Sequence, residues 1–528
     1  MSGLRHAAHS PAGAGAAAGE RAAARPGDKV SAPAAAIAAA REPALARPAL
    51  SWPLLLGVAA FVLIAVLGSG LTDPDVFLHV AVGRWMLEHG RVPMHDPFSF
   101  TRRGAPWVVQ EWGSELLSVL AYRLAGWAGL VLLGAASFGA TLAYLMRFLL
   151  RRMEPLHALV LASLAASMLL PYVVDRPYEF VWPLTMLWIG GLLEASEQRR
   201  APPGWLLAVM LLWVNLHASF ILGLALLLLL ALDPAPSGRQ ARAGGVRRWG
   251  PFCAAAFALA LVNPQGARLL LFPFHVLDIR IMMKYFKDWR PPDLQHLQPL
   301  DLWLIVVVGA AFAGRIRLSL VRAAAVLLLL FMALAHYRNI ALLAMLSPLL
   351  LASPVAAAWP APPRASGRTG ALDRWFHALS PPARAVSVWV TLPLACALAV
   401  SALRARDPQP PALFAPRAAL AAILSRVRQP RILNDVNFGD YLIFRGVPVF
   451  VDARADLYGE AFLKETFDAL SLAPDGHIRA LSARYRVNAI LIMPILAVAR
   501  VLARLPGWRC VYKGKWAVAY VRRAGHTP

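Results

Sequence analysis

The residues SWPLLLGVAAFVLIAVLGSG at positions 51–70 decide the fold class, and LTDPD follows them directly at 71–75. The first stretch carries no charge and is long enough to cross a bilayer as a helix, which takes about 20 apolar residues. Similar apolar runs recur as far as Leu403. Hydrophobic residues make up 59% of the 528-residue chain and charged residues only 16%, whereas a soluble domain is about 45–50% apolar and about 25% charged. This composition excludes a soluble globular protein.

The excess of positive charge has a topological explanation. The chain has 53 Lys and Arg against 29 Asp and Glu, a net charge of +24. In a soluble protein this would suggest nucleic acid, but here most of the excess lies in short segments between apolar runs, as the positive-inside rule describes. We therefore expect no nucleic-acid partner. The three cysteines are far apart and lack metal-binding spacing, which argues against disulfides and a zinc site.

Loop composition predicts the topology. Residues 1–50 are rich in Ala, Pro, Gly and Arg, so we expect a disordered cytoplasmic tail. Basic loops then alternate with loops rich in Asp, His, Trp, Asn and Pro, which places all loops of the second kind outside. The expected transmembrane or partial spans, about eleven, are 51–70, 126–149, 156–174, 179–195, 204–217, 219–232, 250–264, 302–314, 321–337, 340–358 and 385–403. An odd number of crossings puts the C-terminal end outside.

Two of these spans, 204–217 and 219–232, are too short for a full crossing. One long helix over both would place basic loops on opposite faces. We therefore predict a hairpin whose turn, Asn215-Leu216-His217, lies at membrane depth. Irregular backbone is tolerated there only where protein or water surrounds it, so the turn should line a cavity.

Residues 405–528 are expected to form a periplasmic α/β domain after the transmembrane domain of residues 51–404. Strand-like segments are RILND at 431–435, YLIFRG at 441–446, PVFVDAR at 448–454 and VNAILIMP at 487–494, with a closing hairpin of CVYKG at 510–514 and WAVAYVRR at 516–523. Helical patterns at 459–470, 476–486 and 495–504 separate them. This alternation predicts a partly parallel sheet.

The first outward loop, 71–112, holds the candidate chemistry. Asp73 and Asp75 stand two residues apart directly after the first span. Asp75 opens a predicted amphipathic helix at the membrane interface, with His79 one turn later on the same face. A carboxylate in the first turn of a helix is stabilised in its charged form, so it can act as a base or a cation ligand. The structural alternatives are a helix cap or turn at either aspartate, and an interfacial hydrogen bond at His79.

Further polar residues on the outer side are candidates for substrate binding together with His79: Asp96, Glu111, Arg176, His217, Lys284 and Arg338. Asp96 could instead form a turn within HDPFSFT, and Glu111 could cap the second helix of the loop, which begins there and carries Glu115. His217 is a functional candidate by default, because a polar group at membrane depth is expensive.

The cationic candidates have alternatives as well. Arg176 could pair locally with Asp175, and Lys284 lies in a mixed charged and aromatic loop typical of a solvated surface. Arg338 could bind a phosphate, whose oxygens match a guanidinium fork, or only lipid headgroups. The sequence has no P-loop, GxGxxG, GxSxG or HExxH motif, which argues against an ATP-driven pump and a membrane zinc protease.

The motifs DPDVFLHVAVGRW, GRVPMHDPFSFT, PWVVQEW, WVNLHASF, NPQG, NDVNFGDYLIF and VFVDARADLYG resemble bacterial mannosyltransferase-like members of the GT-C superfamily of membrane glycosyltransferases. The resemblance covers about residues 51–470. It implies transfer of a sugar from a polyprenyl-phosphate donor to a lipid, glycan or protein acceptor, outside the cytoplasmic membrane and among membrane lipids. The functional acidic residue of the superfamily falls on Asp75, with Asp73 second. Relatives of the protein-mannosylating type commonly have Asp-Glu where this chain has Asp-Pro-Asp.

The resemblance and the composition together imply a bacterial inner-membrane enzyme in which Asp75 takes a proton from the acceptor. Cations such as Arg338, Arg176 or Lys284 would then stabilise the leaving phosphate. No cofactor is certain, and a divalent metal on Asp73 and Asp75 is an alternative to these cations, although two carboxylates are few ligands for one.

Two other classes compete with this hypothesis. A lipid or glycan transporter or flippase would explain the spans and the polar residues at membrane depth, but we find no paired half-sequences typical of alternating access. A non-catalytic scaffold would present the C-terminal domain to periplasmic proteins. Asp435, Asp452, Arg454 and Asp456 would then form an interaction or glycan-binding surface, unless they make only turns and ion pairs.

Overall fold

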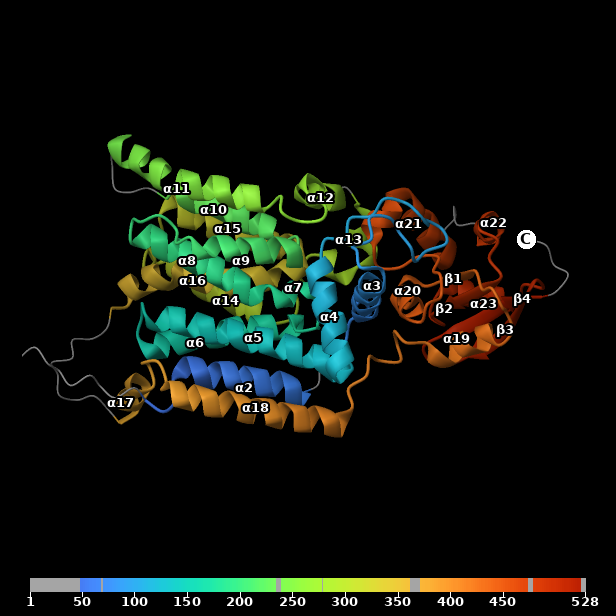
Figure 1. Cartoon of the computed structure of the whole chain (residues 1–528), viewed down its shortest axis with the longest axis horizontal. Coiled ribbons are helices and arrows are strands. Elements are labelled where there is room, and N and C mark those ends of the chain that lie inside the picture. The colour runs from blue at the N-terminus through green and yellow to red at the C-terminus, as the bar shows by residue number, and fades with distance from the viewer. Residues whose placement is uncertain are drawn as a thin grey trace, which may run out of the picture. The chain divides into compact units, whose positions relative to one another are not determined.

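The computed structural model describes residues 48–67, 70–233, 239–277, 279–360, 371–472 and 478–523. The expected disordered tail therefore lies almost entirely outside the described residues. Every expected span coincides with a helix (Figure 1): α2 (Trp52–Leu67), α5 (Trp127–Leu150), α6 (Pro155–Leu169), α8 (Trp182–Glu197), α9 (Trp205–Leu216), α10 (Phe220–Ala231), α11 (Arg239–Leu259), α14 (Pro299–Phe312), α15 (Leu320–Ala335), α16 (Ile340–Ala358) and α18 (Ala385–Arg406).

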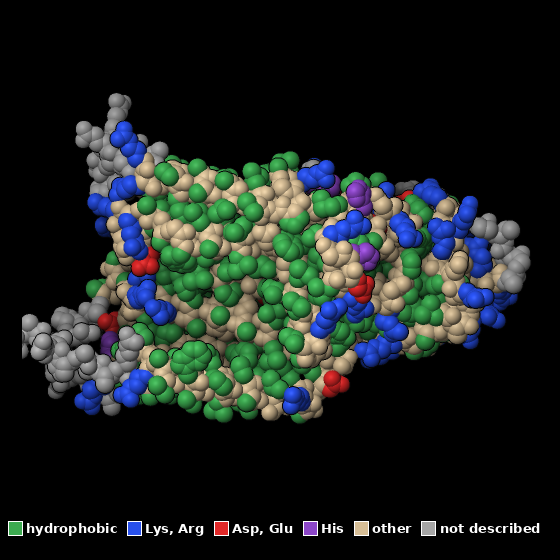
Figure 2. All heavy atoms as spheres, viewed as in Figure 1, with side chains coloured by type: hydrophobic (Ala, Val, Ile, Leu, Met, Phe, Trp, Pro, Cys, Tyr) green, Lys and Arg blue, Asp and Glu red, His purple; other side chains and the backbone are tan. Residues whose placement is uncertain are grey.

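Length and composition qualify four helical segments of the described chain as membrane spans: Trp127–Leu150, Pro155–Tyr172, Tyr337–Ala358 and Ala385–Arg406. The other apolar helices are shorter, so the count of eleven crossings stays a prediction. The flank of the helices drawn in Figure 2 is largely apolar. Large side chains such as Phe312, Phe331 and Trp389 remain exposed. Exposed apolar surface on this scale is typical of contact with lipid, and the chain is accordingly a helical membrane protein.

Small residues allow α2 and α5 to pack closely. A Cβ atom at Gly57 would lie 2.9 Å from the carbonyl oxygen of Gly139 and 2.8 Å from the Cβ of Ala143. Glycine is therefore required at this helix crossing, as in other membrane helix pairs that approach through small residues.

The predicted hairpin is confirmed. Helix α9 ends at Leu216, the backbone of His217 is extended (φ −164°, ψ 140°), and α10 begins at Phe220. The indole of Trp213 donates to Ser219 Oγ at 3.0 Å, which closes the turn. Ser196 Oγ of α8 lies 3.4 Å from Asp233 Oδ2, two residues beyond α10, so the end of α10 lies beside the end of α8 from which the chain leads into α9.

The end of the helices opposite this turn is held by ion pairs between the basic loops. Glu197 lies 2.7 Å from Arg152 and 3.0 Å from Arg322, and it accepts a hydrogen bond from Ser353. Arg322 also approaches Asp233 at 3.8 Å. Lys and Arg side chains gather at this end, on the left of Figure 2. The structure thus brings together loops that the charge pattern assigns to one face.

The C-terminal part contains a four-stranded sheet of order β1-β2-β4-β3. Strand β1 (Ile432–Asn434) is parallel to β2 (Ala489–Ile492), and β4 (Val518–Arg522) is antiparallel to both β2 and β3 (Trp508–Lys513). The partly parallel sheet agrees with the sequence pattern. The surrounding helices are α19 (Arg417–Leu424), α20 (Val436–Phe444), α21 (Ala455–Ser471), α22 (Ile478–Arg484) and α23 (Ala497–Leu502).

Two predicted strands are wrong. YLIFRG belongs to helix α20, which begins directly after β1 because the Asp435 carboxylate accepts the N–H of Asn437 at 3.0 Å. PVFVDAR forms only isolated bridges, from Val449 to Ser99 and Ile432. This segment is extended between two partners and joins no ladder longer than one residue pair.

The helix expected to be amphipathic at the membrane interface is covered by protein on most sides, and its position relative to the membrane stays a prediction. Helix α3 (Asp75–His89) packs between α4 (Trp112–Ala125) and α20, as Figure 1 shows. The ring of Phe77 lies 5.2 Å from Tyr441 of α20 and 5.2 Å from Trp127. Because α4 and α20 cover it, α3 is buried over most of its surface, and Leu87 near its C-terminal end is exposed.

Candidate functional site

The beginning of α3 sets the positions of the two aspartates. Asp73 Oδ1 accepts the backbone N–H of Asp75 at 2.9 Å, so Asp73 makes the turn that starts the helix. Its second oxygen is left for another partner, and Asp75 projects from the first helical residue. The interpretation of Asp73 as a turn residue is therefore correct. The turn uses only Oδ1, so this interpretation does not account for Oδ2.

Both aspartates converge on Arg176, just before α7 (Pro177–Phe180). The Nη2 atom of Arg176 lies 2.5 Å from Asp73 Oδ2 and 3.0 Å from Asp75 Oδ2. Its Nη1 atom lies 2.6 Å from Asp288 Oδ2, on the short helix η2 (Lys287–Trp289). We call these four residues the carboxylate–arginine cluster. Their side chains are 16–35% exposed, so the cluster is reached by solvent without being open to it.

The electrostatics of this cluster favour a charged arginine. Burial opposes the charged form of Arg176, but Asp73, Asp75 and Asp288 outweigh it and raise its pKa. Burial is the main cause that raises the pKa of Asp73 to about 6, against the opposing effect of Arg176. Asp73 is therefore a weaker acid than an exposed aspartate.

A second group of buried titratable residues lies where α3, α4 and the turn after α9 meet. Glu111 Oε1 lies 3.2 Å from His217 Nε2, and Glu111 Oε2 lies 3.8 Å from His79 Nδ1. Glu115, one turn further along α4, is also 3.8 Å from His79 Nδ1. We call these four residues the histidine–glutamate cluster. Glu111 occupies the N-cap position of α4, but its side chain makes no cap hydrogen bond and points to the histidines instead.

Hydrogen bonding fixes the proton on His217. Its Nδ1 accepts the backbone N–H of Ser219 at 3.0 Å, so Nε2 carries the hydrogen and donates to Glu111. Burial would raise the pKa of Glu111, but His217 outweighs it and lowers that pKa to about 2. Burial raises the pKa of Glu115. Two carboxyl groups one helical turn apart thus differ strongly in acidity, which is typical of acid–base sites.

Cationic side chains lie beside these clusters on two loops that pack together. Tyr337 N donates to Arg290 O at 2.8 Å, and His336 Nδ1 lies 2.8 Å from Trp289 O. The Arg338 guanidinium stacks 5.1 Å above Trp289, and its charge acts on Glu111. Lys284, on α13 (Ile281–Tyr285), is exposed. Arg338 therefore lies near the histidine–glutamate cluster, whereas the Lys284 ammonium lies 5.1 Å from the ring of its neighbour Tyr285.

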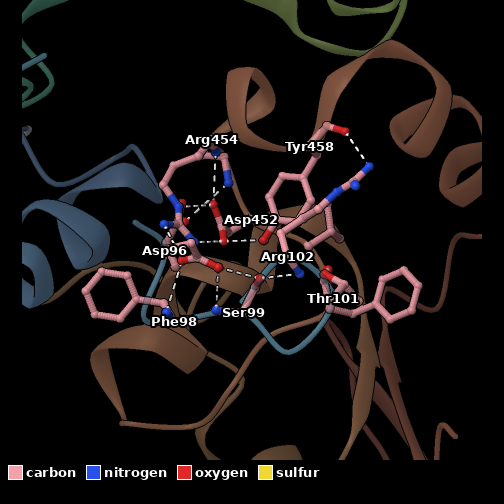
Figure 3. Close-up of polar contacts among 12 residues, drawn as sticks. Asp96, Phe98, Ser99, Thr101, Arg102, Asp452, Arg454 and Tyr458 are labelled. Carbon is pink, nitrogen blue, oxygen red and sulfur yellow. Dashed lines mark hydrogen bonds and ion pairs between the residues drawn. The ribbon is translucent and has the colours of Figure 1, made fainter. Parts of the chain in front are cut away.

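Asp96 forms a turn and a buried ion pair. It is 1% exposed, its oxygens accept from the N–H groups of Phe98 and Ser99, and Oδ1 is 2.8 Å from Arg454 Nη1 (Figure 3). A buried carboxylate whose oxygens are both engaged by the protein has no contact left for a substrate. The turn-forming interpretation of this residue is correct.

Of the four residues expected to form the interaction surface of a scaffold, Asp435, Asp452 and Arg454 are buried and Asp456 is half-buried. Asp452 is 0% exposed and Arg454 5%. Arg454 Nη2 lies 2.6 Å from Asp452, whose Oδ2 also accepts the Tyr458 hydroxyl, and its guanidinium stacks 4.5 Å from Trp107 (Figure 3). These side chains fasten the first outward loop to the C-terminal part and are not presented to a partner protein.

Sequence reasoning missed several residues of the site. Glu115 could have been assigned, because it lies four residues after Glu111 on one helix face. The sequence showed Asp288 only as one residue of a charged and aromatic loop. Its ion pair with Arg176 could not be predicted, because the two residues are far apart in the sequence. The expected local pair of Asp175 with Arg176 is wrong, since Arg176 points to the other aspartates and neither Asp175 oxygen has a hydrogen-bond partner among the described residues.

A metal does not fit the aspartates as they stand. Arg176 already holds Asp73 and Asp75 at ionic distances. In the described part of the chain, no group of three or more His, Cys, Asp or Glu side chains is arranged to hold a metal ion. The chemistry of the site is therefore derived from its side chains alone.

Comparisons with known proteins complete the description. No family model matches the sequence, and none of the curated proteins matches it. Among solved structures, the chain is similar to ArnT from Cupriavidus metallidurans bound to undecaprenyl phosphate, with 14% identity over 90% of this chain and 98% of that one, and a TM-score of 0.45. It is also similar to the oligosaccharyltransferase AglB from Archaeoglobus fulgidus in complex with an inhibitory peptide and a dolichol-phosphate. The identity is 11% over 90% of this chain and 75% of that one, and the TM-score is 0.43.

A third similar structure is the arabinofuranosyltransferase AftD from Mycobacteria, with 14% identity over 90% of this chain and 40% of that one, and a TM-score of 0.46. At such identities the similarity concerns the fold alone, so no residue role is taken from these proteins.

Proposed function

We propose that the protein is a membrane glycosyltransferase that moves a sugar from a polyprenyl-phosphate donor to a lipid, glycan or protein acceptor at the periplasmic face of a bacterial inner membrane. The observation that carries the proposal is the convergence of Asp73 and Asp75, directly after the first apolar helix, on the single guanidinium of Arg176. The site thereby holds a proton acceptor and a phosphate-binding cation within 3.0 Å of each other.

The proposed reaction is a displacement at the anomeric carbon. Asp75 accepts the proton of an acceptor hydroxyl, the hydroxyl oxygen forms the new glycosidic bond, and the bond from the anomeric carbon to the phosphate oxygen breaks. The lipid phosphate leaves with the bonding electrons. Arg176 can exchange a carboxylate for this phosphate without moving far, which both frees Asp75 and neutralises the leaving group.

We assign the remaining candidate residues to the phosphate or to the sugar of the donor according to their positions. Arg338 and Lys284, on the two loops beside Arg176, are proposed to bind the phosphate of the carrier lipid. His79 and His217 are buried, and the largely buried Glu111 lies between them, so we assign these three residues to sugar hydroxyls through directed hydrogen bonds. His217 is preorganised for this, because Ser219 and Glu111 hold both of its ring nitrogens.

The test uses purified protein and a panel of radiolabelled polyprenyl-phosphate sugars, with release of label from the lipid as the readout. Wild type should release label from at least one donor, by transfer or by slow hydrolysis, and Asp75→Asn should not. Glu88→Gln is the matched control, since Glu88 is an exposed carboxylate at the other end of the same helix. No release from any donor by a folded wild type would overturn the proposal in favour of a transporter or a scaffold.

A further inference from the structure

Asp175 and Glu179, close to Arg176 in the sequence, carry two buried carboxyl groups that take no part in the proposed reaction. Asp175 is 1% exposed and Glu179 0%. Asp175 adopts a left-handed backbone conformation (φ 58°), which is strained for an aspartate. This conformation turns its side chain inward, away from the solvent that reaches the neighbouring Arg176.

The space around this pair is made by two glycines. A Cβ atom at Gly70 would lie 1.9 Å from Asp175 Oδ2, and one at Gly134 would lie 2.3 Å from Asp175 Oδ1. The same position at Gly134 is 3.2 Å from Glu179 Oε2. Both carboxyl groups therefore meet above Gly134 of α5, at a site that no larger residue would leave open.

Hydrogen-bond donors satisfy only one of the four oxygens. Glu179 Oε1 accepts the N–H groups of Val174 at 2.5 Å and of Arg176 at 3.2 Å. Within the described residues, both oxygens of Asp175 and Glu179 Oε2 have no partner. Two adjacent buried carboxylates without donors are very costly, and the cost falls sharply when one of them holds a proton that it can share with the other.

We propose that Asp175 and Glu179 share a proton and act as a positioning pair that keeps Arg176 directed at Asp73 and Asp75. The inference rests on the proposed function, because it concerns the same arginine. With one proton the pair carries one negative charge. Loss of that proton adds a second charge behind Arg176, which then competes with Asp73 and Asp75 for the guanidinium.

The neighbouring titratable groups are few. Arg176 is the adjacent cation, and Asp73 follows Gly70 on the α2–α3 connection. Tyr178 donates its hydroxyl to Tyr172 O, and from α5 the Ser137 hydroxyl donates to the backbone oxygen of Glu179. Glu111 and Glu115 of α4, and His217 after α9, belong to the other elements that pack against α7. Burial raises the pKa of Asp175 to about 7, so loss of the proton falls within the working range of an enzyme.

The first experiment needs no turnover. Infrared difference spectra of the purified protein, taken across neutral pH, should show a carboxylic acid C=O band that Asp175→Asn and Glu179→Gln each diminish and that Glu88→Gln leaves intact. Glu88 is the control because it is exposed. A band unaffected by the Asp175 and Glu179 variants would overturn the shared proton, whatever becomes of the proposed function.

The second experiment measures label release against pH. In wild type, release should fall on the alkaline side as the pair loses its proton. Asp175→Asn keeps the shape of the side chain and cannot ionise, so its alkaline limb should move up by at least about one pH unit. An unchanged limb, with the infrared band altered, would overturn the positioning role, because a purely structural role would lower activity without moving the profile.

Discussion

Arg176 is the residue on which the account depends most, because it uses both ends of its guanidinium. One nitrogen serves Asp73 and Asp75, and the other serves Asp288. Lysine would keep the charge but present a single ammonium point, which cannot bridge these partners in one plane.

We therefore expect Arg176→Lys to lower label release at least about tenfold while the protein still folds. Turnover of radiolabelled donor and thermal unfolding in detergent would be measured together. Arg426→Lys, at an exposed arginine in the C-terminal part, is the control and should behave as wild type. Full turnover by Arg176→Lys would show that a positive charge alone is sufficient there.

Glu111 makes a prediction about acid stability. The fold lowers the pKa of Glu111 from 4.5 to about 2, because burial raises this pKa less than His217 lowers it. A group with a lowered pKa stabilises the fold fully above its ordinary pKa, and this stabilisation disappears as the pH falls from about 4.5 to about 2. Glu111→Gln should therefore flatten the loss of thermal stability over that pH window. Equal acid sensitivity of variant and wild type would contradict an ionised Glu111 held by His217.

At the scale of elements, the sequence predicted helices better than it predicted the sheet. Long apolar runs and basic loops located each helix of the bundle, and the shortness of 204–217 and 219–232 gave the hairpin at His217. YLIFRG failed because its apolar and aromatic residues fit a strand or a buried helix equally well over so short a run. What decided the helix was the cap at Asp435, together with burial against α3, which is a tertiary contact.

The α2–α5 crossing gives a prediction at this scale. Gly57→Ala places a methyl group 2.9 Å from the Gly139 carbonyl oxygen and should separate the helices. We expect a loss of about 1–3 kcal/mol in the free energy of unfolding. Gly309→Ala in α14 is the control, since nothing lies within 4 Å of its Cβ position. Loss of stability by Gly309→Ala but not by Gly57→Ala would rule out close packing as the reason for this glycine.

For the whole molecule, long-range contacts decide which candidates work together. The local sequence identified Asp73, Asp75, His79, Glu111 and His217, because acidic and histidine residues beside apolar runs are unusual. The local sequence could not show that Asp96 forms an ion pair with Arg454, because the two residues are 358 positions apart. The Asp96–Arg454–Asp452 contacts fasten the first outward loop to the C-terminal part, and so support the loop that carries the aspartates.

Arg454→Ala tests this coupling. It leaves Asp96 and Asp452 buried and unpaired, so we expect a loss of about 3–5 kcal/mol in stability, measured by unfolding in detergent. Arg484→Ala removes an exposed ion pair with Glu465 and should cost at most about 1 kcal/mol. Similar losses in the two variants would mean that the buried contacts do not hold the loop.

The most direct test of the central claim compares wild type, Asp73→Asn and Asp75→Asn in one series of label-release measurements. We expect Asp75→Asn to lower release at least about a hundredfold, the contribution expected of a general base, and Asp73→Asn to lower it less. Release by Asp75→Asn at the wild-type rate would contradict the assignment of Asp75 as the base and, with it, the proposed mechanism.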